Sequence, residues 1–289
     1  MELLAYAKIN WSLDILGVRE DGYHLMDMLM EPVSIADEIS LRPADELIIS
    51  ADGFPPVRAD RKNLAYRAAE ALREATGFRG GAAIHLHKMI PVGAGMGGGS
   101  SDAAAVLVGL NRLWNTELAS TDLEKIGLVL GADVPFFIRG GLTRTGGIGE
   151  KLESHASFGQ HRLIIIQPCS GLSTAQVFSL WKSSTENSRP STEQVLEALE
   201  TGNLRLLCKS IDNVLQPVAE KLRPQIVRAC MDLKDHGAAV AKMTGSGSAV
   251  FGVFTSSASA QRAYDALHSR YRTIFICHTQ HESMRIIKE

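Results

Sequence analysis

The chain has 289 residues, of which 45% are hydrophobic and 21% are charged, and its formal net charge is -2. This length fits two modest domains that can each bury a core. A nearly neutral chain lacks the basic face that phosphate backbones require, so no nucleic acid partner is expected. Its apolar stretches are shorter than a membrane span and its first residues do not form a signal peptide. The sequence therefore predicts a cytoplasmic protein without a membrane partner.

The cysteines are far apart and form no CxxC pair, so a tetrahedral zinc site is not expected. The sequence instead predicts reduced thiols in a reducing compartment. The four residues are Cys169, Cys208, Cys230 and Cys277.

Partial alternation of apolar and polar residues predicts strands in the first third of the chain. One helix interrupts them, and Gly77 is placed to end it. Its apolar residues recur at helical spacing at Leu64, Ala68, Leu72 and Ala75. The expected strands cover residues 3–16, 33–42, 46–51 and 82–89.

Two further helices are expected after the glycine run at residues 93–99. Ser100 or Ser101 can act as the N-cap of the first. The second is expected to begin at Thr121, where Glu124 completes a capping box. The buried stripe of the first consists of Val106, Leu107, Leu110, Leu113 and Trp114.

Gly131 is expected to end the second helix, and residues 132–135 to lead into another helical turn. Residues 141–153 predict a hairpin, after which the chain becomes polar. We expect a domain boundary there, which divides the chain into residues 1–158 and 159–289.

The second half alternates strands and helices without regular βαβ spacing, which predicts an α+β fold. A polar connection that contains Pro190 is expected at residues 182–194. The expected elements are a strand at 163–169, helices within 191–236, a strand–glycine turn–strand unit at 238–254, a helix at 258–271 and a strand at 273–279.

The strongest signal is the segment from Pro91 to Ala105, in which five glycines fall within seven positions between a strand and a helix. Glycine lets backbone N–H groups converge on an anion without side-chain obstruction. The start of a helix adds unpaired N–H groups and partial positive charge. Together they predict a cradle for phosphate groups.

Three other interpretations of this run are weaker. It contains a Gly93-x-Gly95-x-x-Gly98 pattern, but no second strand with an acidic end follows, as a Rossmann unit requires. A P-loop is excluded because no Gly-Lys-Ser/Thr ends the run. A plain flexible turn remains an alternative, although such turns rarely lead directly into a helix.

Residues 91–105 resemble the central nucleotide motif of the GHMP kinases. Residues 5–10 (AYAKIN) resemble the first motif of that family, and residues 244–248 (TGSGS) the third. The resemblance therefore extends over nearly the whole chain. It implies a two-domain fold with a nucleotide-binding N-terminal domain, a ferredoxin-like C-terminal domain and an active site in the cleft between them. It also implies ATP as the phosphoryl donor, with Mg²⁺ carried on the phosphates.

Three segments point to one branch of the family: residues 21–24 (DGYH), 131–137 (GADVPFF) and 173–178. They resemble the members that phosphorylate the 2-hydroxyl of a cytidine diphosphate-linked methylerythritol in the methylerythritol phosphate route of isoprenoid biosynthesis. Met96 replaces the leucine more common in the family, and Thr244 replaces a common serine.

The resemblance implies that Lys8 and Asp133 are catalytic. Phosphoryl transfer to an alcohol needs a proton acceptor, for which Asp133 is proposed. An aspartate before Val-Pro is also an ordinary helix cap, and the two roles are compatible. Lys8 would stabilise the ionised carboxylate and the developing charge. The alternative for Lys8 is an edge-strand charge that discourages aggregation.

The acceptor substrate is expected to contact Asn10, which alternation places on the same strand face as Lys8. Tyr23 and His24, on a loop, would bind the cytosine by stacking and by contacts to its edge. Phe178 would close the other side of the base, and this role is favoured over the alternative, a helix residue packed in the core. The remaining expected contacts are Thr174 with the methylerythritol part, and Thr244 and Gly245 of the third motif.

The residues expected to bind ATP are those of the loop, with Asn63 and Lys88 near the adenine. The loop residues are Pro91, Val92, Gly93, Ala94, Gly95, Met96, Gly97, Gly98, Gly99, Ser100 and Ser101. Metal ligands are not assigned, although Ser101 and Asp102 lie near the loop. A monomer or a homodimer is expected.

Two other functions remain open. The first is a GHMP kinase for homoserine, mevalonate or a sugar, whose acceptors would not need residues 21–24. The second is a non-catalytic nucleotide-binding paralogue. The presence of both Lys8 and Asp133 argues against it.

Overall fold

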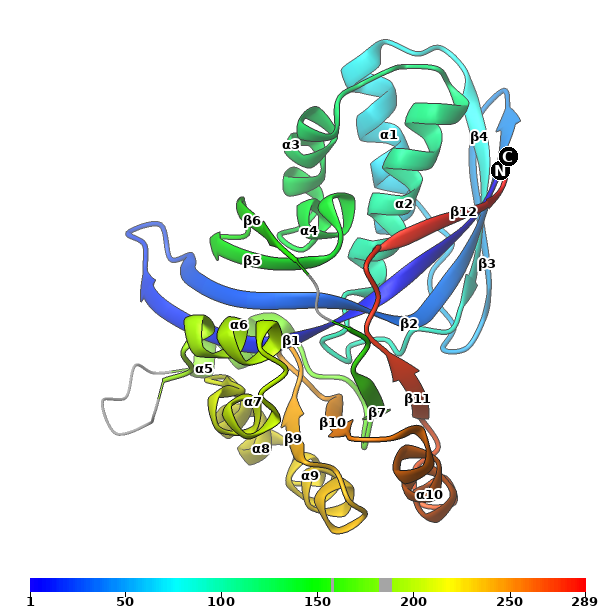
Figure 1. The fold of residues 1–289 in the computed structure, drawn as a ribbon. Helices are drawn as coiled ribbons and strands as arrows, with labels where there is room; N and C mark the ends of the chain where they lie inside the picture. The colour runs from blue at the N-terminus through cyan, green and yellow to red at the C-terminus, as the bar shows by residue number, and fades with distance from the viewer. Residues whose placement is uncertain (157–158, 182–188) are drawn as a thin grey trace.

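The computed structural model describes residues 1–156, 159–181 and 189–289. It has two domains, each built on one sheet, with the N-terminal domain above the C-terminal domain in Figure 1. The predicted boundary after residue 158 falls beside residues 157–158, which lie outside the described part. The predicted connection at 182–194 falls largely on residues 182–188, which also lie outside it.

The N-terminal sheet has eight strands within the described residues, and its main path runs β12-β1-β2-β4-β3. β5 pairs antiparallel with both β2 and β6, and β8 pairs with β1 in parallel. The bounds are β1 (Glu2–Val18), β2 (His24–Ala44), β3 (Leu47–Gly53), β4 (Gly81–Lys88), β5 (Leu142–Gly147), β6 (Lys151–His155), β8 (Asp212–Asn213) and β12 (Met284–Lys288).

Helices α1 to α4 cover one face of this sheet (Figure 1). Their bounds are α1 (Leu64–Thr76), α2 (Gly98–Leu113), α3 (Ser120–Leu130) and α4 (Val134–Arg139). Side chains such as Leu72 and Val106 are fully buried against Leu3 and Leu41 of the sheet. The first and second predicted helices are thus confirmed, and Gly77 ends α1 in a left-handed conformation, as expected.

The C-terminal sheet has the strand order β11-β7-β10-β9, with neighbouring strands antiparallel. With its intervening helices this is the ferredoxin-like arrangement, so the predicted α+β class is confirmed. The strands are β7 (Arg162–Ile166), β9 (Val240–Met243), β10 (Val250–Phe254) and β11 (Ile274–His278). The helices are α5 (Thr174–Leu180), α6 (Thr192–Glu200), α7 (Leu204–Ser210), α8 (Gln216–Leu222), α9 (Gln225–Asp235) and α10 (Ser257–Leu267).

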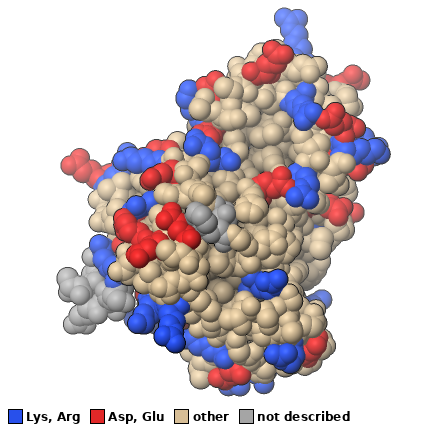
Figure 2. Space-filling model, viewed as in Figure 1, with Lys and Arg blue, Asp and Glu red and all other residues tan. Residues whose placement is uncertain are grey.

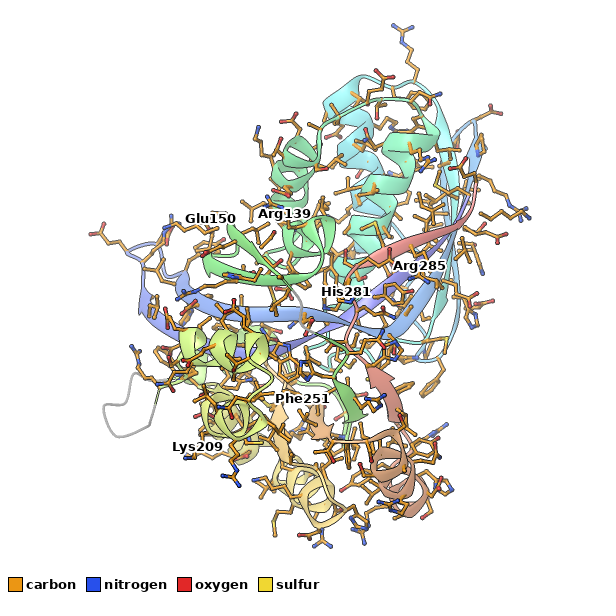
Figure 3. All side chains as sticks on the ribbon, in the orientation of Figure 1. Arg139, Glu150, Lys209, Phe251, His281 and Arg285 are labelled. Carbon is orange, nitrogen blue, oxygen red and sulfur yellow. The ribbon has the colours of Figure 1, made fainter. Side chains whose placement is uncertain are left out.

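β1 is the central strand of the molecule, because the N-terminal helices pack on one of its faces and the C-terminal domain packs on the other. Residues 5–15 are all buried, unlike a half-exposed strand, which alternates. Ile9 and Trp11 pack toward the C-terminal domain, where the Trp11 ring meets Phe251 of β10 edge to face at 5.7 Å. Phe251 is labelled in Figure 3. Lys8 and Asn10 consequently point to the opposite face, toward the N-terminal helices.

Several sequence-based boundaries are wrong. Neither Ser100 nor Ser101 caps α2, because the helix begins at Gly98 with Gly97 as its N-cap. The predicted capping box at Thr121 is absent, since α3 begins at Ser120 and no side chain caps it. His24 is the first residue of β2 rather than part of a loop.

The last strand was not predicted at all. β12 leaves the C-terminal domain and pairs antiparallel with β1, so the chain ends in the N-terminal sheet. Residues 159–289 are therefore not one compact unit. This pairing joins residues at opposite ends of the chain, and sequence patterns within one short segment do not reveal such a contact.

The surface agrees with the small net charge. On the face drawn in Figure 2, basic and acidic side chains are interspersed. None of the helices in the described part of the chain is both long and apolar enough to cross a bilayer.

Replacing the fully buried Leu72 with alanine is expected to lower the free energy of unfolding by about 2–5 kcal/mol, because it leaves a cavity between α1 and the sheet. Urea unfolding followed by circular dichroism measures the change. Arg67→Ala, at an exposed position of the same helix, is the control and should cost less than about 0.5 kcal/mol. Equal losses in both variants would contradict the core position of Leu72.

Candidate active site

A cavity of about 1070 Å³ lies between the two domains. Ligand pockets usually enclose about 300–1,000 Å³, so this one is large enough for two ligands side by side. β1 and the glycine run form one wall, and α5 and the glycine turn after β9 form another. All of the predicted site residues line it except Ser101 and Thr244.

The glycine run leaves backbone N–H groups at the cavity. Gly93, Gly95 and Gly97 have φ angles of 64°, 77° and 74°, a region that glycine adopts without steric cost. No side chain caps the N-terminus of α2. Its first N–H groups therefore remain available to an anion, together with the positive end of the helix dipole.

Backbone contacts with the C-terminal domain fix the shape of this loop. A Cβ at Gly95 would lie 2.3 Å from the Thr244 carbonyl oxygen, and one at Gly93 would lie 2.9 Å from the Cα of Gly171. The Gly93 carbonyl accepts hydrogen bonds from the N–H groups of Leu172 (3.2 Å) and Ser248 (3.3 Å). Glycine is required here because the two backbones touch.

Lys8, Asn10 and Asp133 meet in the cavity, where the Lys8 side chain lies beside Gly97, the N-cap of α2. The Lys8 ammonium donates to Asn10 Oδ1 at 2.6 Å and lies 3.9 Å from Asp133 Oδ2. Burial lowers the pKa of Lys8 below its ordinary value, and the Asp133 carboxylate opposes that shift. The predicted shared face of Lys8 and Asn10 is thus observed.

Asp133 occupies the N-cap position of α4, but its side chain makes no capping hydrogen bond. Its side chain is 30% exposed and lines the cavity. The alternative reading of this residue, an ordinary helix cap, does not explain where its carboxylate lies. The group is free to accept a proton from a bound ligand.

Aromatic side chains gather at another end of the cavity. The rings of His24 and Phe178 are in edge-to-face contact, with centroids 5.1 Å apart, and Trp181 lies beyond His24 at 6.0 Å. Tyr23 is 59% exposed at the same rim. A base cannot fit between His24 and Phe178 while these rings touch. Either one ring moves, or the base stacks on an outer face.

Comparison with known proteins gives two matches to family models. The family model described as "GHMP kinases N terminal domain" matches residues 63–141, and the model described as "GHMP kinases C terminal" matches residues 195–273. The 4-diphosphocytidyl-2-C-methyl-D-erythritol kinase of Clostridium tetani is 39% identical over 279 residues, which are 96% of this chain and 100% of that protein. The chain belongs to the GHMP kinase family. Within it, this identity groups the chain with the 4-diphosphocytidyl-2-C-methyl-D-erythritol kinases.

Solved structures agree with this grouping. A crystal structure of 4-(cytidine 5'-diphospho)-2C-methyl-D-erythritol kinase has a TM-score of 0.82 and 35% identity, and covers 96% of this chain and 99% of the other. A homoserine kinase from Cytophaga hutchinsonii has a TM-score of 0.78 and covers 99% and 97% of the two chains. At 18% identity, the latter shares only the fold.

Two residues predicted to bind ligand in this GHMP kinase lie behind the cavity wall. Ser101 donates its hydroxyl to the Tyr6 carbonyl at 2.7 Å and is 1% exposed. The hydroxyl of Thr244 accepts the Asn10 backbone N–H at 3.0 Å, and Thr244 is fully buried. Their hydroxyls therefore support β1, while Gly245 faces the cavity itself.

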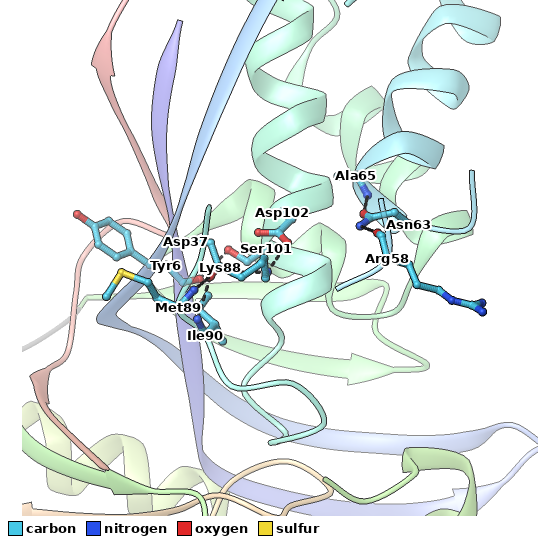
Figure 4. A network of polar contacts seen from close by, with 10 residues as sticks. All are labelled: Tyr6, Asp37, Arg58, Asn63, Ala65, Lys88, Met89, Ile90, Ser101 and Asp102. Carbon is cyan, nitrogen blue, oxygen red and sulfur yellow. Dashed lines mark hydrogen bonds and ion pairs between the residues drawn. The ribbon is translucent and has the colours of Figure 1, made fainter. Parts of the chain in front are cut away.

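The two residues expected near the adenine are both engaged by the protein. Asn63 caps α1, accepting from Ala65 N–H at 2.9 Å and donating to the Arg58 carbonyl at 2.7 Å (Figure 4). The Lys88 ammonium is bonded to Asp37 and Asp102. Both residues line the cavity, but their polar groups are held in place by protein partners.

The lining also includes residues that the sequence did not point to, in segment 56–62 before α1. Arg58 and Lys62 of this segment bring positive charge to the rim of the cavity. Their only signal in the sequence is basic charge shortly before a helix, which is too common to indicate a site.

Gly95→Ala is expected to destabilise the protein by about 1–3 kcal/mol and to weaken nucleotide binding, because the new methyl group would collide with the Thr244 carbonyl. Thermal melting and calorimetric titration with ADP measure the two effects. Gly202→Ala is the control, since Gly202 also has a positive φ (64°) but has open space around its Cβ position. If both variants behaved alike, backbone strain rather than the contact would explain the loss.

Proposed function

We propose that this GHMP kinase transfers the γ-phosphoryl group of ATP to the 2-hydroxyl of 4-diphosphocytidyl-2-C-methyl-D-erythritol, giving the 2-phosphate and ADP. The reaction is a step of the methylerythritol phosphate route of isoprenoid biosynthesis. One observation carries the proposal: the Asp133 side chain stands at the N-cap of α4 without capping it, and its carboxylate lies 3.9 Å from the buried Lys8 ammonium.

The glycine loop binds the phosphates of ATP in this proposal. Its N–H groups and the uncapped start of α2 supply donors that need not move during the reaction. Asn63 and segment 56–62 line the adenine side. Phosphoryl transfer requires mainly positioning and charge stabilisation, which such a rigid loop provides.

Asp133 accepts the proton of the attacking hydroxyl, and the hydroxyl oxygen forms the new bond to the γ-phosphorus while the bond to the ADP oxygen breaks. The Lys8 ammonium lies 3.9 Å from the Asp133 carboxylate, close to the site of phosphoryl transfer in this proposal. An incoming anionic phosphate favours the charged form of its ammonium group, offsetting the effect of burial. Asn10 holds that ammonium in place.

The acceptor lies at the aromatic end. Tyr23, His24 and Phe178 bind the cytosine, and Thr174, whose hydroxyl is 2.9 Å from that of Ser246, contacts the methylerythritol part. Homoserine or mevalonate would leave this aromatic surface unused. Those alternative acceptors are therefore less well supported, and a non-catalytic paralogue would not need the pair Lys8 and Asp133.

Mg²⁺ is proposed to be carried on the phosphates. Among the described residues, no group of three or more His, Cys, Asp or Glu side chains could hold a metal ion. Magnesium bound to a nucleotide takes most of its ligands from phosphate and water, so it fits a cavity without a protein cage. Cytoplasmic location and a monomeric or homodimeric state also remain predictions.

Asp133→Ala is expected to lower kcat by about 10²- to 10⁴-fold, the usual contribution of a proton acceptor. The release of ADP with 4-diphosphocytidyl-2-C-methyl-D-erythritol measures it. The free energy of unfolding should change by less than the ~1 kcal/mol typical of a lost cap, because no capping bond is lost. Full activity in the variant would remove Asp133 from the mechanism. An inactive wild type that phosphorylates homoserine, mevalonate or a sugar would overturn the proposed substrate.

Phe178→Ala is expected to raise KM for the acceptor by about 5- to 150-fold, since stacking on a base is worth about 1–3 kcal/mol. KM for ATP should stay within about twofold, because Phe178 lies away from the loop in the proposed complex. Steady-state kinetics with each substrate varied in turn give both values. Leu180→Ala, on the same helix at a position 48% exposed and outside the cavity lining, is the control. An unchanged acceptor KM would assign Phe178 to packing alone.

A further inference from the structure

Three buried charged residues meet behind the glycine loop (Figure 4). Lys88, the last residue of β4, donates its ammonium to Asp37 of β2 and to Asp102 of α2. The side chains of Asp37, Lys88 and Asp102 are 0%, 3% and 4% exposed. We call these three residues the loop cluster.

The loop cluster holds the chain on both sides of the loop. Asp37 Oδ1 accepts the backbone N–H groups of Met89 (2.6 Å) and Ile90 (2.8 Å), which immediately precede Pro91. Through Lys88, the same carboxylate is linked to Asp102, which follows the loop in α2. The start and the end of the loop are thus fixed to one point on β2.

Stability alone does not account for this arrangement. Removing three charges from water costs several kcal/mol per ion, and apolar residues of similar volume are often as stable or more so. In addition, Asp102 Oδ1 has no hydrogen-bond partner among the described residues. The location of the cluster, at the two ends of the phosphate-binding loop, suggests a role in that loop.

We infer that Asp37, Lys88 and Asp102 are positioning residues that hold the glycine loop in the shape that binds nucleotide phosphates. The inference rests on the proposed function, in which this loop binds ATP. None of the three needs to touch the phosphates, because they act through Met89, Ile90 and the first turns of α2.

The cluster also carries charge. With both carboxylates ionised it has a net charge of −1, which opposes the binding of an anion nearby. Burial and the neighbouring Asp37 raise the pKa of Asp102 to about 7, against the effect of Lys88. Asp102 therefore takes up a proton as the pH falls through about 7, and the repulsion of a bound phosphate falls with it. The charged groups that face Asp102 are Lys88 from β4 and Asp37 from β2.

The two aspartates provide a matched pair of variants. Asp37 uses both oxygens as acceptors, so Asp37→Asn must lose either the bond to Lys88 or the bonds to Met89 and Ile90. Asp102 uses only one oxygen, so Asp102→Asn keeps the bond to Lys88 and loses only the charge. Asp232→Asn is the control for a buried carboxylate elsewhere, since Asp232 is bonded to Arg270 and Tyr271 outside the cavity lining.

The test is calorimetric titration of each protein with ADP alone, and separately with 4-diphosphocytidyl-2-C-methyl-D-erythritol alone, at pH 6 and pH 8. Asp37→Asn should weaken ADP binding by about tenfold or more at both pH values and leave acceptor affinity within about twofold. Asp102→Asn should match the wild type at pH 6 and bind ADP more tightly than the wild type at pH 8. Titration of the ADP phosphate itself is common to all proteins and cancels in the comparison.

Three results would overturn the inference. The first is an ADP affinity of folded Asp37→Asn equal to that of the wild type. The second is a loss of acceptor affinity in Asp37→Asn as large as its loss of ADP affinity, and the third is an ADP affinity that depends on pH in Asp102→Asn as it does in the wild type. Asp232→Asn should lower the melting temperature without changing either affinity. If Asp37→Asn does not fold, the pH comparison with Asp102→Asn still decides. A wild type that binds ADP but does not turn over the acceptor would instead count against the proposed function.

Discussion

The contact between two stretches of glycine backbone is the constraint on which the cavity depends. The nucleotide loop meets the C-terminal domain at Gly95 and Gly245, and a Cβ at Gly245 would lie 2.5 Å from the Gly95 carbonyl oxygen. Because neither side has a side chain there, the two domains approach closely enough for hydrogen bonds such as Ala249 N–H to the Ala94 carbonyl at 3.1 Å. One loop therefore both closes the domain interface and presents donors to the cavity.

Burial of β1 on both faces explains the behaviour of its polar residues. Ile9 and Trp11 form the interface with the C-terminal domain, so Lys8 and Asn10 lie on the cavity side, where both are buried from water. A buried ammonium group is stable only with polar partners, and those of Lys8 are the Asn10 side-chain oxygen and the Asp133 carboxylate. The same covering of β1 that stabilises the fold thus places an ammonium group with a lowered pKa beside the carboxylate of Asp133.

Much of this site could be predicted because its signals are local. The glycine run and the period-two spacing of Lys8 and Asn10 each lie within one short segment. The cap of α2 was predicted wrongly because a glycine in the left-handed region can begin a helix without a capping side chain, which starts the helix earlier than Ser100. The loop cluster and β12 were missed for a different reason. Asp37 lies 51 residues from Lys88, and no pattern within either strand indicates the pairing.

The charges around the cavity indicate how it distinguishes phosphates from other anions. Lys8 and Lys88 both line the cavity, but each is paired with carboxylates, so neither offers an uncompensated positive charge. Arg58 and Lys62, the other cations of the described lining, lie at the exposed rim, where water screens them. Attraction in the interior therefore comes mainly from N–H groups fixed by the loop and the start of α2, whose strength depends on geometry. Such a site holds an anion firmly only when its oxygens match those N–H directions, so the shape of the loop, more than net charge, determines what binds.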